Sequence, residues 1–352
     1  MNGTIDIDTG NVWLIPIVSA DFYPYKTELK TSVLKGKFYF SDSVLYPTAY
    51  KIFLKCGDSV IYVSGDFFIE HGHQYISCDI DSNNITPEIE NKSTNELNGE
   101  FCPYFADIDK KVEHFLHTKD SLKTKCTEKD FLSMSTKLSE TKEMLSTERS
   151  HAFLMYSRQH PESYVVLWTL INNLVTKGYH DIDETIYDNM SKDVKESYSG
   201  RKLREKLSIL KKIKIGNPFP QLKLYDQADN VVALSKFNRS KYTLVDFWFT
   251  HCPSCIKEFK KYKEIYSLYK RTDFEIIGVS IDDDKYISEW KKMIVEKELA
   301  WPQYLDKEQV NSKFLSLEYF PSNFLLDENG LIIKKNVSTV DLEKLLSENI
   351  NK

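Results

Sequence analysis

Residues 243–256 read Thr-Leu-Val-Asp-Phe-Trp-Phe-Thr-His-Cys-Pro-Ser-Cys-Ile, and this stretch decides the fold of the C-terminal part of the chain. The nearly continuous apolar run 243–249 is typical of a strand that is covered on both faces. Apolar residues at helical spacing follow it, at Ile256, Phe259, Ile265, Tyr266 and Tyr269. The stretch therefore predicts a buried strand, a turn, and a helix that opens at Cys252 and Cys255.

Strands and helices continue to alternate to the end of the chain. Phe274–Ile281 is a second apolar strand-like run, and a helix is expected around Ile287–Val295. Asp327-Glu328-Asn329-Gly330 separates two short apolar segments, which indicates a hairpin. Ser338–Asp341 has the pattern of a capping box that opens the last helix. Residues 214–352 are thus predicted to form an α/β domain, with a mixed sheet and helices on both faces.

The Cys-Pro-Ser-Cys motif indicates redox chemistry. Two thiols three positions apart in a first helical turn can reach one another. Free backbone N–H groups and the helix macrodipole favour a thiolate at Cys252. That thiolate attacks a disulfide, and Cys255 resolves the mixed disulfide. No cofactor beyond this pair is expected, and no metal, because the sequence lacks the second Cys-x-x-Cys or His pair that a zinc site requires.

The same residues resemble a known family. Residues 244–255 are similar to the active-site segment of the thioredoxin superfamily, and Phe320-Pro321-Ser322 resembles its cis-proline loop. Residues 274–282 and Glu258 are similar to the TlpA/ResA branch. The resemblance covers residues 214–352. It implies a thiol–disulfide oxidoreductase that reduces protein disulfides.

The resemblance also implies particular site residues. It implies a cis Phe320–Pro321 peptide bond that faces the cysteine pair. The place of Cys252 at the N-terminus of the helix further predicts that it lies nearer to solvent, with Cys255 deeper in the helix. The residues that it places in the substrate cleft are Trp248, His251, Pro253 and Phe320.

Two positions depart from the family pattern. His251 stands where the family usually has Trp, and a cation there lowers the pKa of a neighbouring thiol. The alternative is that His251 is an exposed residue of no consequence. Phe320 is larger than the small or β-branched residue usual before the cis-proline, so we expect a different substrate preference.

Two carboxyl groups are candidate proton acceptors for Cys255. Asp246 lies inside an apolar strand, where a carboxylate is costly unless it has a partner or a task. In thioredoxins the residue that matches Asp246 takes the proton, whereas in the TlpA/ResA branch the acid matches Glu258. This chain has both, so we expect the two to share a proton. The alternative is that Glu258 points to solvent beside Lys257 and Lys261 and that Asp246 acts alone.

The N-terminal two thirds of the chain carry no catalytic motif. Short segments rich in β-branched and aromatic residues predict a β-sandwich-like domain over residues 1–103. Residues 34–40, Leu-Lys-Gly-Lys-Phe-Tyr-Phe, resemble the β-domain of exported Bacteroidetes proteins. Residues 104–213 are expected to be helical, with a charged hairpin over 118–149, a helix that begins at Pro161 and a helix end at Gly178.

The other four cysteines do not form a disulfide framework. Cys56 and Cys78 share strand faces with apolar residues and are expected to be buried hydrophobes. Cys102 and Cys126 are also expected to be structural. The 352 residues carry a net charge of −5, which gives no basic excess for binding nucleic acid.

Location and partners follow from the resemblance alone. The first residues are not a signal peptide, so the protein is either cytoplasmic or its export signal is absent from this sequence. The resemblance favours an extracytoplasmic, periplasm-facing protein, anchored by lipid. It also implies protein disulfide substrates, a membrane electron donor, and a homodimer through the N-terminal regions.

Two other functions stay open at this point. A peroxidase of the peroxiredoxin type needs Pro-x-x-x-Thr-x-x-Cys, but Thr250 lies only two residues before Cys252 and no Pro stands at the required place. A binding or scaffold protein with an incidental redox pair is the alternative from a different class.

Overall fold

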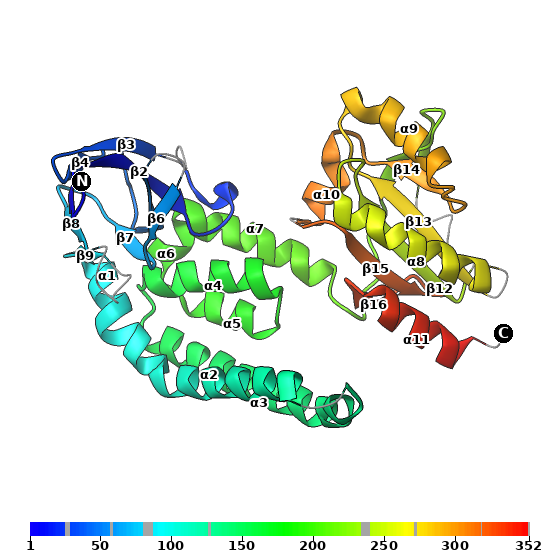
Figure 1. Cartoon of the computed structure of the whole chain (residues 1–352), viewed down its shortest axis with the longest axis horizontal. Helices are drawn as coiled ribbons and strands as arrows, with labels where there is room; N and C mark the ends of the chain where they lie inside the picture. Colours follow the sequence, from blue (N-terminus) through cyan, green and yellow to red (C-terminus); the bar gives the residue numbers. More distant parts are fainter. Residues whose placement is uncertain are drawn as a thin grey trace. The chain divides into compact units, whose positions relative to one another are not determined.

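A computed structural model describes residues 1–24, 29–56, 59–79, 87–125, 128–233, 240–270, 273–317 and 319–350. The chain divides into two compact units, residues 1–205 and 206–352 (Figure 1). The boundaries expected at 103/104 and 213/214 stay predictions. Cys126 and the side chain of Cys56 lie outside the described residues.

The N-terminal unit is built on one sheet. Its strands are β1 (Asn2–Ile5), β2 (Thr9–Pro16), β3 (Leu29–Leu34), β4 (Lys37–Tyr39), β5 (Thr48–Cys56), β6 (Ser59–Val63), β7 (Phe67–Ile69), β8 (Tyr75–Cys78) and β9 (Glu88–Ile89). The order is β6-β5-β2-β3-β4-β1-β8-β9, and β7 pairs with β5. The strand-rich region is confirmed, and its hydrogen bonding is continuous from β6 to β9, because β4 pairs with both β3 and β1.

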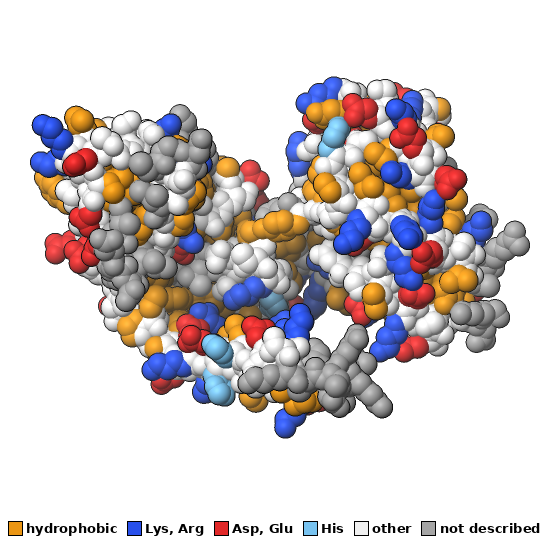
Figure 2. All heavy atoms as spheres, viewed as in Figure 1, with side chains coloured by type: hydrophobic (Ala, Val, Ile, Leu, Met, Phe, Trp, Pro, Cys, Tyr) orange, Lys and Arg blue, Asp and Glu red, His pale blue; other side chains and the backbone are white. Residues whose placement is uncertain are grey.

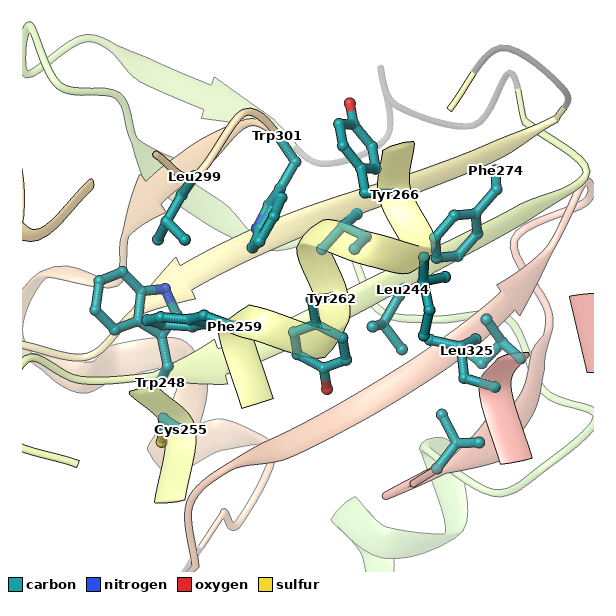
Figure 3. Close-up of a cluster of buried hydrophobic side chains, with 14 of the residues drawn as sticks. Leu244, Trp248, Cys255, Phe259, Tyr262, Tyr266, Phe274, Leu299, Trp301 and Leu325 are labelled. Carbon is teal, nitrogen blue, oxygen red and sulfur yellow. The ribbon is translucent and has the colours of Figure 1, made fainter. Parts of the chain in front are cut away.

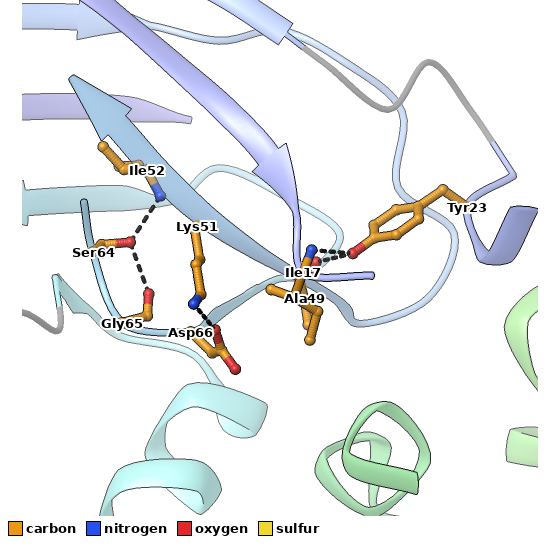
Figure 4. Close-up of polar contacts among 8 residues, drawn as sticks. All are labelled: Ile17, Tyr23, Ala49, Lys51, Ile52, Ser64, Gly65 and Asp66. Atoms are coloured by element: carbon orange, nitrogen blue, oxygen red, sulfur yellow. Dashed lines mark hydrogen bonds and ion pairs between the residues drawn. The ribbon is translucent and has the colours of Figure 1, made fainter. Parts of the chain in front are cut away.

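Side chains tie the ends of this sheet to neighbouring loops (Figure 4). The Tyr23 hydroxyl donates to the carbonyl of Ala49 at 2.7 Å and accepts the N–H of Ile17 at 2.9 Å. Ser64 accepts the N–H of Ile52 at 2.7 Å and donates to the carbonyl of Gly65. These bonds satisfy backbone groups where the ladder ends.

Helices complete the N-terminal unit and lead out of it. They are α1 (Lys92–Glu96), α2 (Cys102–Lys125), α3 (Glu128–Gln159), α4 (Tyr164–Lys177), α5 (Ile182–Asn189), α6 (Lys192–Glu196) and α7 (Tyr198–Lys212), which crosses into the second unit. The charged hairpin is α2 and α3. The helix expected from Pro161 begins instead at Tyr164, because the Ser163 side chain caps it by accepting the N–H of Val166. It ends at Gly178, as predicted.

The C-terminal unit contains the predicted mixed sheet. Its strands are β10 (Lys223–Tyr225), β11 (Val231–Ala233), β12 (Tyr242–Trp248), β13 (Phe274–Ser280), β14 (Gln303–Leu305), β15 (Ser322–Asp327) and β16 (Ile332–Lys335). They run in the order β11-β10-β14-β13-β12-β15-β16. β12 is parallel to β13 and antiparallel to β15. The predicted hairpin is β15 and β16.

Helices pack a large aromatic core against this sheet. They are α8 (Pro253–Tyr269), α9 (Ile287–Glu296), α10 (Val310–Phe314) and α11 (Thr339–Asn349). Ser338 caps α11 by accepting the N–H of Asp341, which confirms the predicted cap. Figure 3 shows Trp248, Phe259 and Tyr262 packed beside Cys255 in this core. Across the described parts of both units, no helix is long and apolar enough to span a membrane.

Candidate active site

The interior strand β12 and helix α8 position the cysteine pair. Cys252 is the N-cap residue of α8, and its Sγ accepts the backbone N–H of Cys255 at 3.1 Å. The two residues are joined by a disulfide with a Cα–Cα distance of 5.3 Å. Cys252 is 2% exposed and Cys255 is 1% exposed. Both side chains are therefore buried in this disulfide state, and the expectation that Cys252 lies nearer to solvent than Cys255 stays a prediction.

A buried aspartate holds the turn between β12 and α8. Asp282 follows β13 and is 5% exposed. It accepts the backbone N–H of Thr250 at 3.1 Å and also the Thr250 hydroxyl. Ser280 donates to the same carboxylate at 2.7 Å. Asp282 thus reaches over from the end of the neighbouring strand β13 and holds the turn in place two residues before Cys252.

The proline loop lies beside the cysteine pair. The Phe320–Pro321 peptide bond is cis, as predicted. The Ser254 hydroxyl donates to the Phe320 carbonyl at 3.3 Å and lies 3.3 Å from the Sγ of Cys252. The ring of Phe320 meets that of Phe249 edge-on, with centroids 5.8 Å apart. Two aromatic side chains thus stand next to the motif.

The other predicted cleft residues divide into buried and exposed. Trp248 is 0% exposed, and its indole N–H donates to Gln303 at 3.1 Å. The expectation that Trp248 lines the cleft is corrected: it packs in the core. Pro253 and His251 are exposed. His251 Nε2 lies 3.3 Å from a carboxylate oxygen of Glu289 in α9.

The two predicted carboxyl groups converge on a tyrosine. Asp246 is 1% exposed and Glu258 is half-buried. The Tyr262 hydroxyl oxygen lies 3.5 Å from Asp246 Oδ1 and 3.2 Å from Glu258 Oε2. The alternative in which Glu258 simply points to solvent does not fit this contact. Lys261 is engaged by Glu264 and Glu343 instead.

Burial perturbs both acids. It raises the pKa of the Asp246 carboxyl well above its usual range, and the nearby Glu258 carboxylate raises it further. Partial burial also raises the pKa of Glu258. The hydrogen bond from Tyr262 opposes both changes. Both groups therefore hold a proton more readily than free carboxyls do, as a general base that works near neutral pH must.

Sequence reasoning missed two members of this cluster, Tyr262 and Asn323. Tyr262 lies four residues after Glu258, a spacing that places two side chains on one helix face, and this signal could have identified it. Asn323 lies opposite Asp246 in β15. Its amide donates to Tyr262 at 3.4 Å and exchanges bonds with the backbone of Val337. No local pattern marks such a cross-strand partner.

The described cysteines outside the motif have different surroundings. Cys78 is buried, and this burial raises the pKa of its thiol to about 12. Cys102 is exposed, yet partial burial of its sulfur raises its pKa as well. A raised pKa disfavours the nucleophilic thiolate. In the part of the chain that the structure describes, no group of His, Cys, Asp and Glu side chains is arranged to hold a metal.

Comparison with known proteins adds independent information. Residues 214–348 match the Redoxin family. Thiol-disulfide oxidoreductase ResA of Bacillus cereus is 27% identical over 134 residues, which are 38% of this chain and 76% of that protein. The thioredoxin domain of a Bacteroides vulgatus thiol-disulfide oxidoreductase is 33% identical, with 39% of this chain and 99% of that domain covered and a TM-score of 0.36. A thiol:disulfide interchange protein from a Bacteroides species is also 33% identical. The match covers 40% of this chain and 92% of that protein, with a TM-score of 0.36.

Proposed function

Because this chain belongs to the thioredoxin superfamily and is a ResA-like thiol–disulfide oxidoreductase, we propose that it reduces protein disulfides with the dithiol of Cys252 and Cys255. The observation that carries the proposal is the position of Cys252 at the N-terminus of α8, where its sulfur accepts the N–H of Cys255. A sulfur in this place gains most from that bond when it is a thiolate, and the helix macrodipole adds to the effect.

The reaction proceeds in two exchanges. The Cys252 thiolate attacks one sulfur of the substrate disulfide, so a mixed disulfide forms and the first substrate thiolate leaves. Cys255 then loses its proton and attacks the sulfur of Cys252, which releases the second substrate thiolate. The substrate gains two electrons, and the protein ends with the Cys252–Cys255 disulfide, the state that the structure contains.

Three groups assist these steps in the proposal. Asp246 and Glu258 accept the proton of Cys255, and their burial supports that role. The proline loop at Pro321 presents a backbone edge beside the pair, to which an extended substrate can add. Phe249 and Phe320 favour an apolar side chain next to the substrate cysteine, because both rings are partly buried beside the motif.

The remaining parts of the proposal concern the setting of the reaction. We place the protein outside the cytoplasm, attached to a membrane and recharged by a membrane electron donor; the resemblance of residues 34–40 to exported proteins supports this. We also propose a homodimer through the N-terminal unit. Large apolar side chains exposed on its sheet support pairing, among them Leu34, Tyr39 and Tyr75.

Trapping of a mixed disulfide tests the proposed function. Reduced protein is mixed with insulin, which supplies accessible disulfides, and the products are separated without reducing agent. Cys255→Ser is expected to accumulate a covalent adduct, because the resolving thiol is gone, whereas Cys252→Ser is expected to form none. Cys102→Ser is the matched control and should turn over like the parent protein.

Equal trapping by the two active-site variants would contradict the assigned order of attack. A protein that consumes peroxide without a partner protein, and leaves insulin intact, would instead be a thiol peroxidase.

A further inference from the structure

A single hydroxyl group lies between the two carboxyl groups of the site. Tyr262 is 0% exposed, and its oxygen lies 3.5 Å from Asp246 Oδ1 and 3.2 Å from Glu258 Oε2. The amide of Asn323 donates to the same oxygen at 3.4 Å. Three polar side chains, from β12, α8 and β15, thus meet at one buried oxygen atom.

The hydrogen-bonding capacity of a tyrosine hydroxyl limits how this cluster can be completed. The group has one proton to donate and two lone pairs to accept with. The Asn323 amide occupies one lone pair, and the hydroxyl proton serves one carboxylate. The second carboxyl group meets only the remaining lone pair, so its contact is a hydrogen bond only when that carboxyl is itself protonated. Two ionised carboxylates would leave one contact without a proton.

We propose that Tyr262 joins Asp246 and Glu258 into one unit that holds a single shared proton and passes it between the buried and the half-buried carboxyl group. At rest the proton lies on Asp246, the less exposed acid, because a buried charge costs more than a half-buried one. Tyr262 then donates to the Glu258 carboxylate, in agreement with the shorter of its two distances.

Transfer of the proton needs no charged tyrosine. The Asp246 proton moves to the Tyr262 oxygen while the Tyr262 proton moves to Glu258. Afterwards Asp246 is a carboxylate, Glu258 is a carboxylic acid, and Tyr262 is again neutral with its proton directed at Asp246. One proton has moved from the buried carboxyl to the one nearer solvent, and the net charge of the cluster is unchanged.

Other charges do not disturb this balance among the residues that the structure describes. β13 places Gly278 opposite Asp246, and β15 places the neutral Asn323 there. The two carboxyl groups and Tyr262 are the ionisable groups that act on one another in this cluster. The lysines of α8 next to Glu258 and Tyr262 in the sequence are Lys257, Lys261 and Lys263; Lys261 is paired with Glu264 and Glu343, Lys263 is paired with Glu298, and none of the three shifts the pKa of either acid.

The use of this proton transfer in the reaction depends on the proposed function. An acid that is already protonated cannot take the proton of Cys255, so passing the resting proton to Glu258 turns Asp246 into a base. Cys255, Glu258 and Tyr262 occur at positions i, i+3 and i+7 of α8 and therefore lie along one helix face. Tyr262 is a positioning residue in this scheme, since it acts through the two acids.

A double-mutant cycle on the disulfide form tests the inference. The readout is the pKa of Asp246, followed by the carbon-13 resonance of its carboxyl group in the full chain. Glu258→Gln is expected to lower that pKa, because a negative charge is lost and the new amide can donate to Tyr262, which frees the hydroxyl proton for Asp246. The decrease should be markedly smaller when Glu258→Gln is made together with Tyr262→Phe.

Controls separate this effect from general destabilisation. Tyr266→Phe removes another tyrosine hydroxyl from α8, and Glu258→Gln in that background should lower the pKa as much as in the parent protein. An equal decrease with and without the Tyr262 hydroxyl would overturn the inference. If Tyr262→Phe does not fold, the parent protein decides: at neutral pH Asp246 should be protonated and Glu258 ionised, and finding both ionised would overturn it.

The titration uses oxidised protein without substrate. It can therefore fail while insulin reduction succeeds, and the shared proton can be present even if the protein reduces nothing, so failure of the inference and failure of the proposed function are distinguishable. In the reduced protein, Tyr262→Phe should slow turnover about tenfold at neutral pH, with recovery at high pH where Cys255 ionises unaided.

Discussion

Each unit of the chain contains a buried tyrosine that meets a carboxyl group, but the balance of donors and acceptors differs. In the N-terminal unit, Glu96 accepts a hydrogen bond from Tyr156 at 3.3 Å and another from the Ser163 hydroxyl. Two donors serve one carboxylate there. In the C-terminal unit, the single hydroxyl of Tyr262 serves both Asp246 and Glu258.

This difference determines what each cluster does. The Glu96 carboxylate accepts from two hydroxyl donors, so its cluster is a structural contact that holds helices in place. Two carboxyl groups with one donor are satisfied only when they keep a proton. The same residue types therefore build a structural contact in one unit and a proton-holding site in the other.

The largest expected effect is on exchange chemistry. Asp246→Asn should slow disulfide reduction at neutral pH by about a hundredfold, because it removes the buried base, and Glu258→Gln should slow it less. The rates should approach that of the parent protein at high pH, where the Cys255 thiol ionises without help. The measurement is insulin reduction against pH for the two single variants and the double variant.

Flat profiles that match the parent protein in all three variants would remove both carboxyl groups from the mechanism. The N-terminal cluster provides the contrast, since Glu96→Gln should leave the whole profile unchanged.

The next effect is on stability. The raised pKa of Asp246 means that the folded state binds its proton more tightly than the unfolded state does. This contribution to stability is fully present below the pKa that Asp246 has in the unfolded chain. It is lost as the pH rises through the pKa that Asp246 has in the folded protein. Asp246→Asn should therefore be more stable than the parent at high pH, by on the order of 1–3 kcal/mol, and should gain little or nothing at low pH.

Urea unfolding of the disulfide form across this range checks the sign. A variant that is less stable than the parent at high pH would contradict the prediction, because it would show that the ionised Asp246 carboxyl is well paired in the folded protein.

These clusters also show which features the sequence alone can predict. Local signals were sufficient for the redox helix, the hairpin at Asp327–Gly330 and the Ser338 cap, because each depends on a few consecutive residues. The cis bond at Pro321 and the convergence of Asp246 with Glu258 were expected through the family resemblance and are present.

What the sequence did not predict depends on strand order and depth. Asn323 meets Tyr262 only because β15 lies beside β12, a pairing between segments far apart in the chain. The family resemblance places Trp248 in the cleft, but both faces of β12 are covered, so its side chain packs in the core. The N-terminal strands were recognised singly, whereas their union into one sheet depends on the pairing of β4 with β1.

A smaller effect is expected from the N-terminal cluster itself. Glu96→Ala leaves the hydroxyls of Tyr156 and Ser163 without their acceptor, and these residues are 1% and 4% exposed. The loss should be about 1–2 kcal/mol of unfolding free energy, measured in urea. Glu96→Gln keeps an acceptor oxygen and should lose less. Equal losses in the two variants would mean that packing, and not the hydrogen bonds, supplies the stability.

The smallest effect is expected where a carboxylate and its partner lie at the surface. Figure 2 shows charged side chains of both signs interspersed with apolar ones on the visible face of the C-terminal unit. The pair of His251 and Glu289 is of this exposed kind, with side chains 57% and 51% exposed. Exposed pairs contribute only about 0–1 kcal/mol, and salt screens them.

His251 directly precedes Cys252, the attacking thiol. The His251–Glu289 pair therefore tests whether an exposed charge near a thiol affects its reactivity as strongly as a buried one does. Glu289→Gln removes a negative charge near Cys252, which favours the thiolate, so alkylation of the reduced protein should become faster below the thiol pKa. The change should be less than about threefold, because water screens both groups, and it should shrink as salt is added. Measured alkylation rates against pH at low and high salt check this. A tenfold change that survives high salt would show that an exposed charge controls Cys252 as strongly as the buried acids control Cys255. The difference between carboxyl groups with enough donors and those without would then not explain the chemistry of the site.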